Sequence, residues 1–178
     1  MSSPARATPV VDLDRYVPAY LTWIANKLSR GASQAYLDSF GIGIEIWRIL
    51  VLLAIENSIS AQRVSKVIGM DKASVSRAFK SMAASGLVAI RLDAGDRRLR
   101  IAALTAKGRR LHDRVFGVAL ERERAFLAVL SSEERDTLIG LLRRLHDNLP
   151  AVEAATAAYL ARHHPRPARR RTALRDAA

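Results

Sequence analysis

The sequence contains no cysteine. A chain without cysteine cannot form disulfide bonds, thiolate metal sites or cysteine-based redox switches. Aromatic residues make up only 6% of the 178 residues, whereas hydrophobic residues make up 49%. The core must therefore be mostly aliphatic and rich in alanine, as in a helical protein, and the length suits one domain with short arms.

The sequence also lacks the segments that direct a protein into or across a membrane. No apolar run reaches the roughly 18 residues that a membrane-spanning helix needs. The N-terminal MSSPARATPV has no apolar centre of the kind found in signal peptides. We therefore expect a soluble, cytoplasmic protein that does not associate with membranes.

Motifs of the common enzyme classes are missing as well. There is no P-loop, GxSxG or HExxH motif. His112-Asp113 and His146-Asp147 are pairs of direct neighbours, and neighbouring residues on a helix do not face each other. We predict that the protein is not an enzyme and has no catalytic residue, cofactor or metal site.

Positive charge is concentrated in one internal segment of a chain whose net charge is +12. Residues 60–110 carry twelve Lys and Arg against three acidic residues, and residues 162–178 carry six against one. The segments 1–59 and 111–161 are neutral or slightly acidic. A clustered basic segment is typical of a protein that binds a polyanion, because Lys and Arg that neutralise phosphates release counterions.

Hydrophobic periodicity predicts a mainly helical chain. Apolar residues at helical spacing predict helices over about 14–39 and 44–56 at the start of the chain. Another is expected from about 105 to 130, and the capping box Ser131-x-x-Glu134 opens the next. The helical pattern resumes over 151–161, past Pro150.

Two short helices joined by a tight turn are predicted between residues 60 and 85. Ser60 can cap a helix over 61–68, and Gly69 can end it. Asp71 can cap the second helix, over 72–85. The side chains expected to point inward are Val64, Val67 and Ile68 in the first helix, and Val75, Ala78, Phe79 and Met82 in the second. This arrangement is a helix-turn-helix.

The outward face of the second helix suits the major groove of DNA. It presents Lys72, Ala73, Ser74, Ser76, Arg77 and Lys80. Small side chains let a helix approach the bases, while Arg and Lys can bond guanine edges or phosphates. The alternative is an ordinary solvated face, which more often carries glutamates paired with lysines. This helix has no acidic residue after its cap.

A β-hairpin is predicted next, because LVAIRL and LRIAAL alternate in hydrophobicity around DAGDRR, residues 93–98. Such a hairpin beside a recognition helix is a wing, and its arginines can enter a narrow minor groove. Asp93 or Asp96 would stiffen the loop by bonding backbone amides or by orienting a neighbouring arginine. The alternative is that the hexapeptide is only a solvated turn.

The segment from Trp47 to Gly108 resembles the core of the MarR family of bacterial transcription regulators. The motifs that carry the resemblance are Asp-Lys-x-Ser-x-x-Arg from Asp71, the Gly-Leu-Val exit, the Asp-Arg-Arg wing, and Leu-Thr-x-Lys-Gly from Leu104. They cover residues 44–110, and the helix order extends the resemblance to about 149. It implies a mainly helical fold with a small β-hairpin wing.

The resemblance also implies partners and residue roles. Members of the family are homodimers in which the first and last helices interlock, and the two winged helices bind a near-palindromic site. The wing arginine two places after the aspartate enters the minor groove, which is Arg98 after Asp96. Arg97 would then contact a phosphate, although the reverse assignment stays open.

Many members of the family respond to small aromatic acids held between the dimerisation helices and the winged helix. The residues that could line such a cleft here are Tyr20, Trp23, Trp47, Arg48, His112 and Phe116. The alternative is that these aromatic side chains form part of the core. The absence of cysteine excludes the peroxide-sensing branch of the family.

These observations predict a sequence-specific DNA-binding regulator, acting as a repressor. Residues 12–161 would form one domain, with the winged helix over about 44–104 and dimerisation helices over 12–40 and 105–161. Residues 1–11 are expected to be a disordered arm. Residues 162–178 are expected to be a disordered basic tail that either adds non-specific DNA attraction or only solubilises the chain. The alternative function is an architectural or anti-repressor protein that binds DNA with little base readout or pairs with another regulator.

Overall fold

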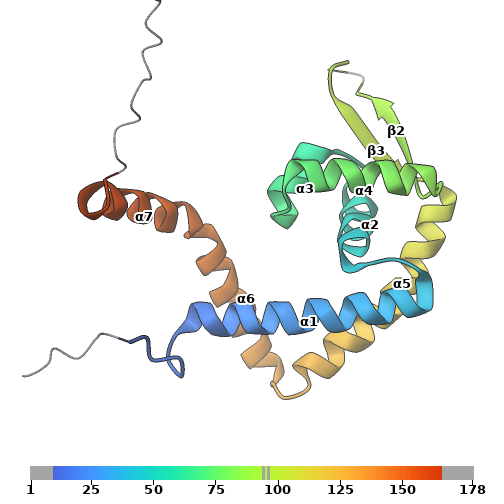
Figure 1. Cartoon of the computed structure of the whole chain (residues 1–178). Coiled ribbons are helices and arrows are strands. Elements are labelled where there is room, and N and C mark those ends of the chain that lie inside the picture. Colours follow the sequence, from blue (N-terminus) through green and yellow to red (C-terminus); the bar gives the residue numbers. More distant parts are fainter. Residues whose placement is uncertain (1–9, 94, 96, 166–178) are drawn as a thin grey trace, which may run out of the picture. The chain divides into compact units, whose positions relative to one another are not determined.

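The computed structural model describes residues 10–93, 95 and 97–165 (Figure 1). The predicted arm and tail therefore lie largely outside the described residues, as does Asp96. The chain divides into two compact units, residues 1–123 and 124–178, which we describe separately. The described elements are α1 (Val17–Phe40), α2 (Ile44–Glu56), β1 (Ser58–Ser60), α3 (Ala61–Ile68), α4 (Lys72–Ala84), β2 (Val88–Leu92), β3 (Arg100–Leu104), α5 (Ala106–Leu127), α6 (Ser132–Asp147) and α7 (Leu149–His163). The predicted fold class, helices with a small antiparallel wing, is confirmed.

The core of the first unit is built around α2. Ile49, Leu50 and Leu53 are fully buried, and Val64 of α3 and Val75 of α4 are buried beside them in the same apolar cluster. The apolar spacing in the sequence therefore predicted the inward face of α4 correctly. In α3 the prediction was wrong for Val67, which is 44% exposed. Three residues turn the helix by about 300°, so Val67 lies about 60° around the helix axis from Val64, toward the edge of the inward face.

α1 begins at Val17 rather than near residue 14, with Pro18 in its first turn, where a missing N–H costs no hydrogen bond. Gly41, at a φ of 69°, ends it in the left-handed region, and its amide donates to the Leu37 carbonyl. Gly31 lies inside the helix without interrupting it. The side chain of Arg122 from α5 passes over Gly31, and its guanidinium donates to the Leu28 carbonyl at 3.2 Å.

The sheet contains one strand that the sequence did not predict. β1 follows Asn57, whose φ of 61° turns the chain out of α2, and pairs antiparallel with β3 in the order β1-β3-β2. Three residues are too few to show an alternating pattern, which explains why periodicity missed this strand. β2 and β3 form the predicted hairpin, with Val88 opposite Leu104 and Leu92 opposite Arg100.

The second unit contains α6 and α7. The predicted capping box is present, because the Ser131 amide donates to the Glu134 carboxylate at 2.8 Å and the Glu134 amide donates to the Ser131 hydroxyl at 3.2 Å. No residue of α6 or α7 is fully buried. Exposed large apolar side chains on these helices are Ile139, Leu141, Leu142, Leu145, Leu149, Val152, Tyr159 and Leu160.

Candidate nucleic-acid interface

The helix-turn-helix is formed by α3 and α4, and both of its predicted caps are present. The Ser60 hydroxyl accepts from the Arg63 amide at 3.2 Å, and the Asp71 carboxylate accepts from the Ser74 amide at 2.9 Å. Hydrogen bonds from Ser74 lower the pKa of Asp71, because they stabilise the ionised carboxylate that caps the helix. In the turn, Gly69 adopts a φ of 77°, which favours glycine because it has no Cβ.

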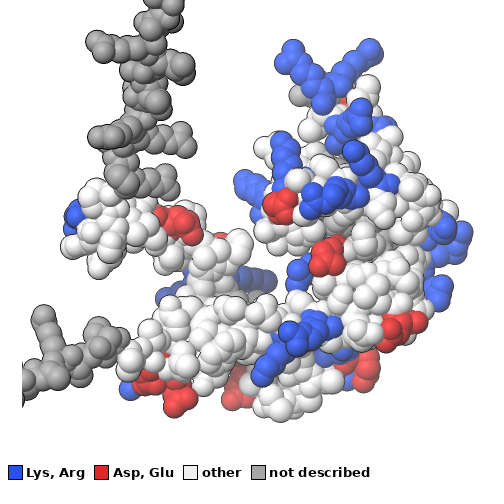
Figure 2. Space-filling view, viewed as in Figure 1, with Lys and Arg blue, Asp and Glu red and all other residues white. Residues whose placement is uncertain are grey.

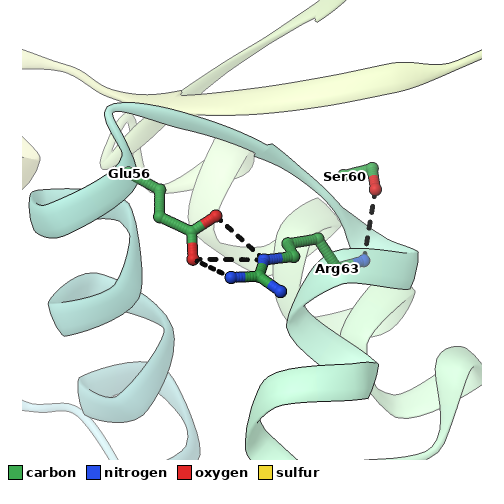
Figure 3. A network of polar contacts seen from close by, with 3 residues as sticks. All are labelled: Glu56, Ser60 and Arg63. Atoms are coloured by element: carbon green, nitrogen blue, oxygen red, sulfur yellow. Dashed lines mark hydrogen bonds and ion pairs between the residues drawn. The ribbon is translucent and has the colours of Figure 1, made fainter.

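A bidentate ion pair fastens α3 to the end of α2 (Figure 3). The Arg63 side chain donates to both carboxylate oxygens of Glu56, at distances from 2.8 to 3.1 Å. The same residue donates its backbone amide to Ser60, so one residue contributes both to the cap and to the ion pair. The hydrogen bond from Arg63 lowers the pKa of Glu56. The contacts of Arg63 therefore hold the first helix of the motif against the end of α2.

The outward face of α4 is as polar as the sequence predicted. Five of the six residues on it are exposed, and Ser74 is half-buried. The Arg77 guanidinium donates to the Ser74 hydroxyl at 2.7 Å, which holds the arginine along the helix surface. The side chains that the structure brings together on this face are Lys72, Ala73, Ser74, Ser76, Arg77 and Lys80. The face therefore offers hydroxyl, guanidinium and ammonium donors from one rigid element.

The wing is the hairpin of β2 and β3, which extends beyond α4 (Figure 1). At its tip the Asp93 carboxylate accepts from the Gly95 amide at 2.9 Å, as expected for a residue that stiffens the loop. The Asp93 amide donates to the Leu99 carbonyl at 2.8 Å and closes the loop. Arg97 and Arg98 are both exposed at this tip. The predicted role of Asp96 lies outside the described residues.

The Leu-Thr-x-Lys-Gly motif fastens the wing to the rest of the unit. The Thr105 hydroxyl donates to the Gly86 carbonyl at 2.7 Å, and the Lys107 ammonium donates to the Ser85 carbonyl at 2.8 Å. Gly108 lies directly against the Leu87 carbonyl, where a Cβ atom would clash with it. The motif therefore holds the turn between α4 and β2, which sets where the wing starts relative to the recognition helix.

Lys and Arg side chains gather over α3, α4 and the wing in the space-filling view (Figure 2). We call this surface the basic face and define it by six of its exposed residues, Lys66, Lys72, Arg77, Lys80, Arg97 and Arg98. Lys66 of α3 is a member that motif reasoning missed, and the net charge of the segment was the only signal for it. A cluster of exposed cations of this kind attracts the DNA backbone without regard to sequence.

The candidate effector residues fall into two groups in the first unit. The rings of Trp47, His112 and Phe116 form a row, with centroids 5.4 and 5.7 Å apart, while Tyr20 contacts Trp23 with centroids at 5.7 Å. Trp47 is only 8% exposed and belongs to the core cluster, as the core alternative expected for it. The sixth candidate, Arg48, donates to the Ser29 hydroxyl at 2.8 Å.

Comparison with known proteins shows to which family this architecture belongs. A sequence model of the MarR family matches residues 40–99. The HTH-type transcriptional regulator YdgJ of Bacillus subtilis (strain 168), itself uncharacterised, is 33% identical over 117 residues, which are 64% of this chain and 70% of the relative. The crystal structure of a MarR/EmrR family transcriptional regulator from Acinetobacter sp. ADP1 superposes with a TM-score of 0.74 at 33% identity, over 79% of this chain and 99% of that one. The chain belongs to the MarR family.

This MarR-family chain is thus a DNA-binding transcription regulator with a winged helix-turn-helix, and its family is not one of enzymes. The fold is also similar to that of BpsR from Bordetella bronchiseptica, at a TM-score of 0.69 and 24% identity over 78% of this chain and 99% of that one. DNA binding by BpsR is regulated by 6-hydroxynicotinic acid. In the part of the MarR-family chain that is described, no helix is long and apolar enough to span a membrane. The same part holds no cluster of three or more potential metal ligands.

Proposed function

We propose that this MarR-family protein is a cytoplasmic homodimer that binds a near-palindromic DNA operator and represses transcription there. The observation that carries the proposal is the outward face of α4, where small and basic side chains are exposed and no acidic residue follows the cap. A helix of this kind can lie in the major groove, with Arg77 and Lys72 within reach of base edges or phosphates. Sequence readout is therefore assigned to α4.

The wing supplies the second contact. Arg98 enters the minor groove and Arg97 binds the flanking phosphate, a division of roles taken from the family resemblance. In support, both arginines are exposed at the tip of a hairpin whose loop is closed by the Asp93 hydrogen bonds. Narrow A·T-rich minor grooves have an enhanced negative potential, so the wing favours operators with A·T-rich flanks.

Dimerisation is supported by apolar surface outside the winged helix. On the N-terminal half of α1, large apolar side chains between 42% and 54% exposed are Val17, Tyr20, Leu21, Trp23 and Ile24. α6 and α7 carry the exposed apolar residues named above. Exposed large apolar side chains that gather on one helix often mark a protein interface. In a homodimer these helices would cover one another and place the two winged helices about one DNA turn apart.

A small aromatic acid is the proposed effector that releases the DNA. Tyr20, Trp23 and Phe116 are exposed and can stack on an aromatic ring, while Arg48 offers a cation for a carboxylate. BpsR, which has a similar fold, responds to such an acid. In this proposal Trp47 and His112 form the inner wall of the cleft rather than its mouth.

Selection of bound sequences from a random DNA pool tests this function most directly. We expect enriched sites with a dyad whose half-sites lie about 10 bp apart, and a specificity ratio of roughly 10³ or more over random DNA. Sedimentation at micromolar concentration should show a dimer. Binding that depends steeply on salt but shows no sequence preference would instead support the architectural alternative.

A further inference from the structure

One face of the wing is apolar and becomes exposed as the hairpin leaves the core. Val88, Ile90 and Leu92 alternate along β2, so their side chains lie on the same face of the strand. Their exposed fractions rise from 4% to 39% and then to 56%. Val88 belongs to the apolar core cluster, whereas Ile90 and Leu92 do not. We call Ile90 and Leu92 the apolar strip of the wing.

The pairing of the hairpin places the apolar strip beside arginines. Leu92 is opposite Arg100 in the register of β2 and β3, and residues opposite each other project from the same face. The next residue, Asp93, closes the loop by donating its amide to the Leu99 carbonyl at 2.8 Å. Leu92 therefore lies at the neck of the hairpin, directly behind a tip where Lys and Arg side chains gather (Figure 2).

Exposed apolar side chains are unusual on a strand in this position. The sheet has the order β1-β3-β2, so β2 is an edge strand. Edge strands of soluble proteins commonly carry charged side chains, because an apolar edge invites pairing with other chains. The other face of β2 carries Ala89 and Arg91, which are exposed as well. The apolar strip is thus more apolar than a solvated wing requires, which indicates a partner that covers it.

We propose that the apolar strip contacts the deoxyribose walls of the DNA minor groove, behind the arginines of the wing tip. The sugars of DNA present C–H groups between charged phosphates, so a surface that fits them combines apolar side chains with cations. Arg100, on the same face as Leu92, supplies the cation. Proteins that bind the minor groove often use apolar side chains in addition to Arg and Lys. The inference rests on the proposed insertion of the wing and adds a contact that reads no base.

The two residues of the strip should contribute unequally. Leu92 lies at the neck, whereas Ile90 is two residues, about 7 Å, farther from the tip. Since the tip enters the groove, Leu92 reaches its walls, and Ile90 reaches only the outer rim. Substitution of Leu92 should therefore cost more affinity than substitution of Ile90.

Titrations of duplex DNA with the full-length protein over a range of salt concentrations test the proposal. Leu92→Gln should weaken binding about fivefold at every salt concentration, because loss of an apolar contact leaves the number of released counterions unchanged. Ile90→Gln should weaken binding about twofold. Arg97→Gln, in contrast, should reduce the salt slope by about 1. Calorimetry should give a less negative heat-capacity change of DNA binding for Leu92→Gln than for the wild type.

Two further variants serve as controls. Leu37→Gln makes the same change on α1, at a side chain that is 50% exposed and lies outside the wing, and should bind DNA like the wild type. Leu92→Met keeps an apolar side chain of similar size and should bind within about twofold of the wild type. The thermal midpoints of all these variants should stay close to that of the wild type, because the substituted side chains are exposed.

The proposal is overturned if Leu92→Gln binds DNA like the wild type, if its loss of affinity comes with a smaller salt slope, or if Leu37→Gln loses as much. It is also overturned if Leu92→Gln changes the sedimentation of the protein without DNA, since a second copy of the chain would then cover the strip.

The same titrations on a selected operator and on a random duplex of equal length separate this inference from the proposed function. Deoxyribose is the same at every step of DNA, so the loss caused by Leu92→Gln should appear on both duplexes. If the wild type does not discriminate between the duplexes, the proposed function fails, and the contact of Leu92 is still measured. If the wild type discriminates but Leu92→Gln loses no affinity, only this inference fails.

Discussion

α2 and α6 both carry leucine-rich faces, but only α2 buries its face within the chain. Leu50 and Leu53 of α2 are fully buried, whereas Leu142 and Leu145 of α6 are 40% and 49% exposed. Burial of a leucine side chain is worth about 1.5–3 kcal/mol, so leucines that remain exposed contribute little to the stability of one chain. The exposed leucines of α6 are therefore available to the homodimer contact proposed above.

The largest effect on stability is expected at Gly108 of α5, which has no room for an added atom beside Leu87. Gly108→Val should destabilise the first unit by roughly 3 kcal/mol or more, because its side chain would be forced against the Leu87 carbonyl. Gly117→Ala on the same helix is the control, since a Cβ there meets nothing within 4 Å. We expect that variant to be neutral or stabilised by up to about 1 kcal/mol. Urea unfolding of both variants measures the difference, and similar midpoints would contradict it.

The comparison between α2 and α6 is tested by the same substitution in both helices. Leu50→Ala should cost about 2–5 kcal/mol of unfolding free energy, because it leaves a cavity in a closed core. Leu142→Ala should cost much less in urea unfolding at low protein concentration, yet shift the sedimentation equilibrium toward monomer. If Leu142→Ala left self-association unchanged, α6 would not be part of a dimer interface.

Substitutions on the basic face are expected to have an intermediate effect. They should lower the affinity for DNA rather than the stability of the fold. Arg98→Ala should weaken operator binding about tenfold with an almost unchanged thermal midpoint, and the loss should be largest when the operator flanks are A·T-rich. Arg143→Ala, an exposed arginine on α6, is the control and should leave binding unaltered. Equal losses of affinity with A·T-rich and G·C-rich flanks would contradict insertion of Arg98 into the minor groove and would support the alternative of a solvated turn.

Arg77→Ala should cost about 1–3 kcal/mol of binding free energy and relax the preference at particular bases if the guanidinium bonds a guanine edge. The hydrogen bond to the Ser74 hydroxyl uses only one of the five N–H donors of the guanidinium, so others remain for a base. Comparison of sites selected by the variant and by the wild type distinguishes the two roles of Arg77. A loss of affinity that is equal for all DNA sequences would indicate that Arg77 contacts a phosphate.

The smallest effect on stability is expected from loss of the ion pair between Glu56 and Arg63. Arg63 holds the pKa of Glu56 below its ordinary value of 4.5 in the folded state. Its contribution to stability is therefore present above about pH 4.5 and is lost as the pH falls through the lower, folded pKa. Glu56→Gln should lower the urea midpoint at pH 7 by a small amount, and the difference from the wild type should shrink on acidification. A difference that is the same at pH 7 and pH 3.5 would contradict this linkage.

Much of the fold could be predicted because its signals are local. The caps Ser60, Asp71 and Ser131 each satisfy an amide within three residues, so they can be recognised without knowing the tertiary structure. The outward face of α4 followed from helical spacing alone. β1 could not be found in this way, since its three residues become a strand only by pairing with β3, more than forty positions later.

By itself the sequence determined the helix-turn-helix, the hairpin, the family and the location of the basic charge, because capping, periodicity and charge depend on neighbours along the chain. Only the tertiary structure decided that Val67 is exposed while Val64 is buried, and that Gly108 lies against Leu87. It also brought the end of α1 to α5, where the Arg114 guanidinium lies over the Phe40 ring. Such contacts join residues far apart in the sequence, and the packing of whole helices, rather than any local preference, determines them.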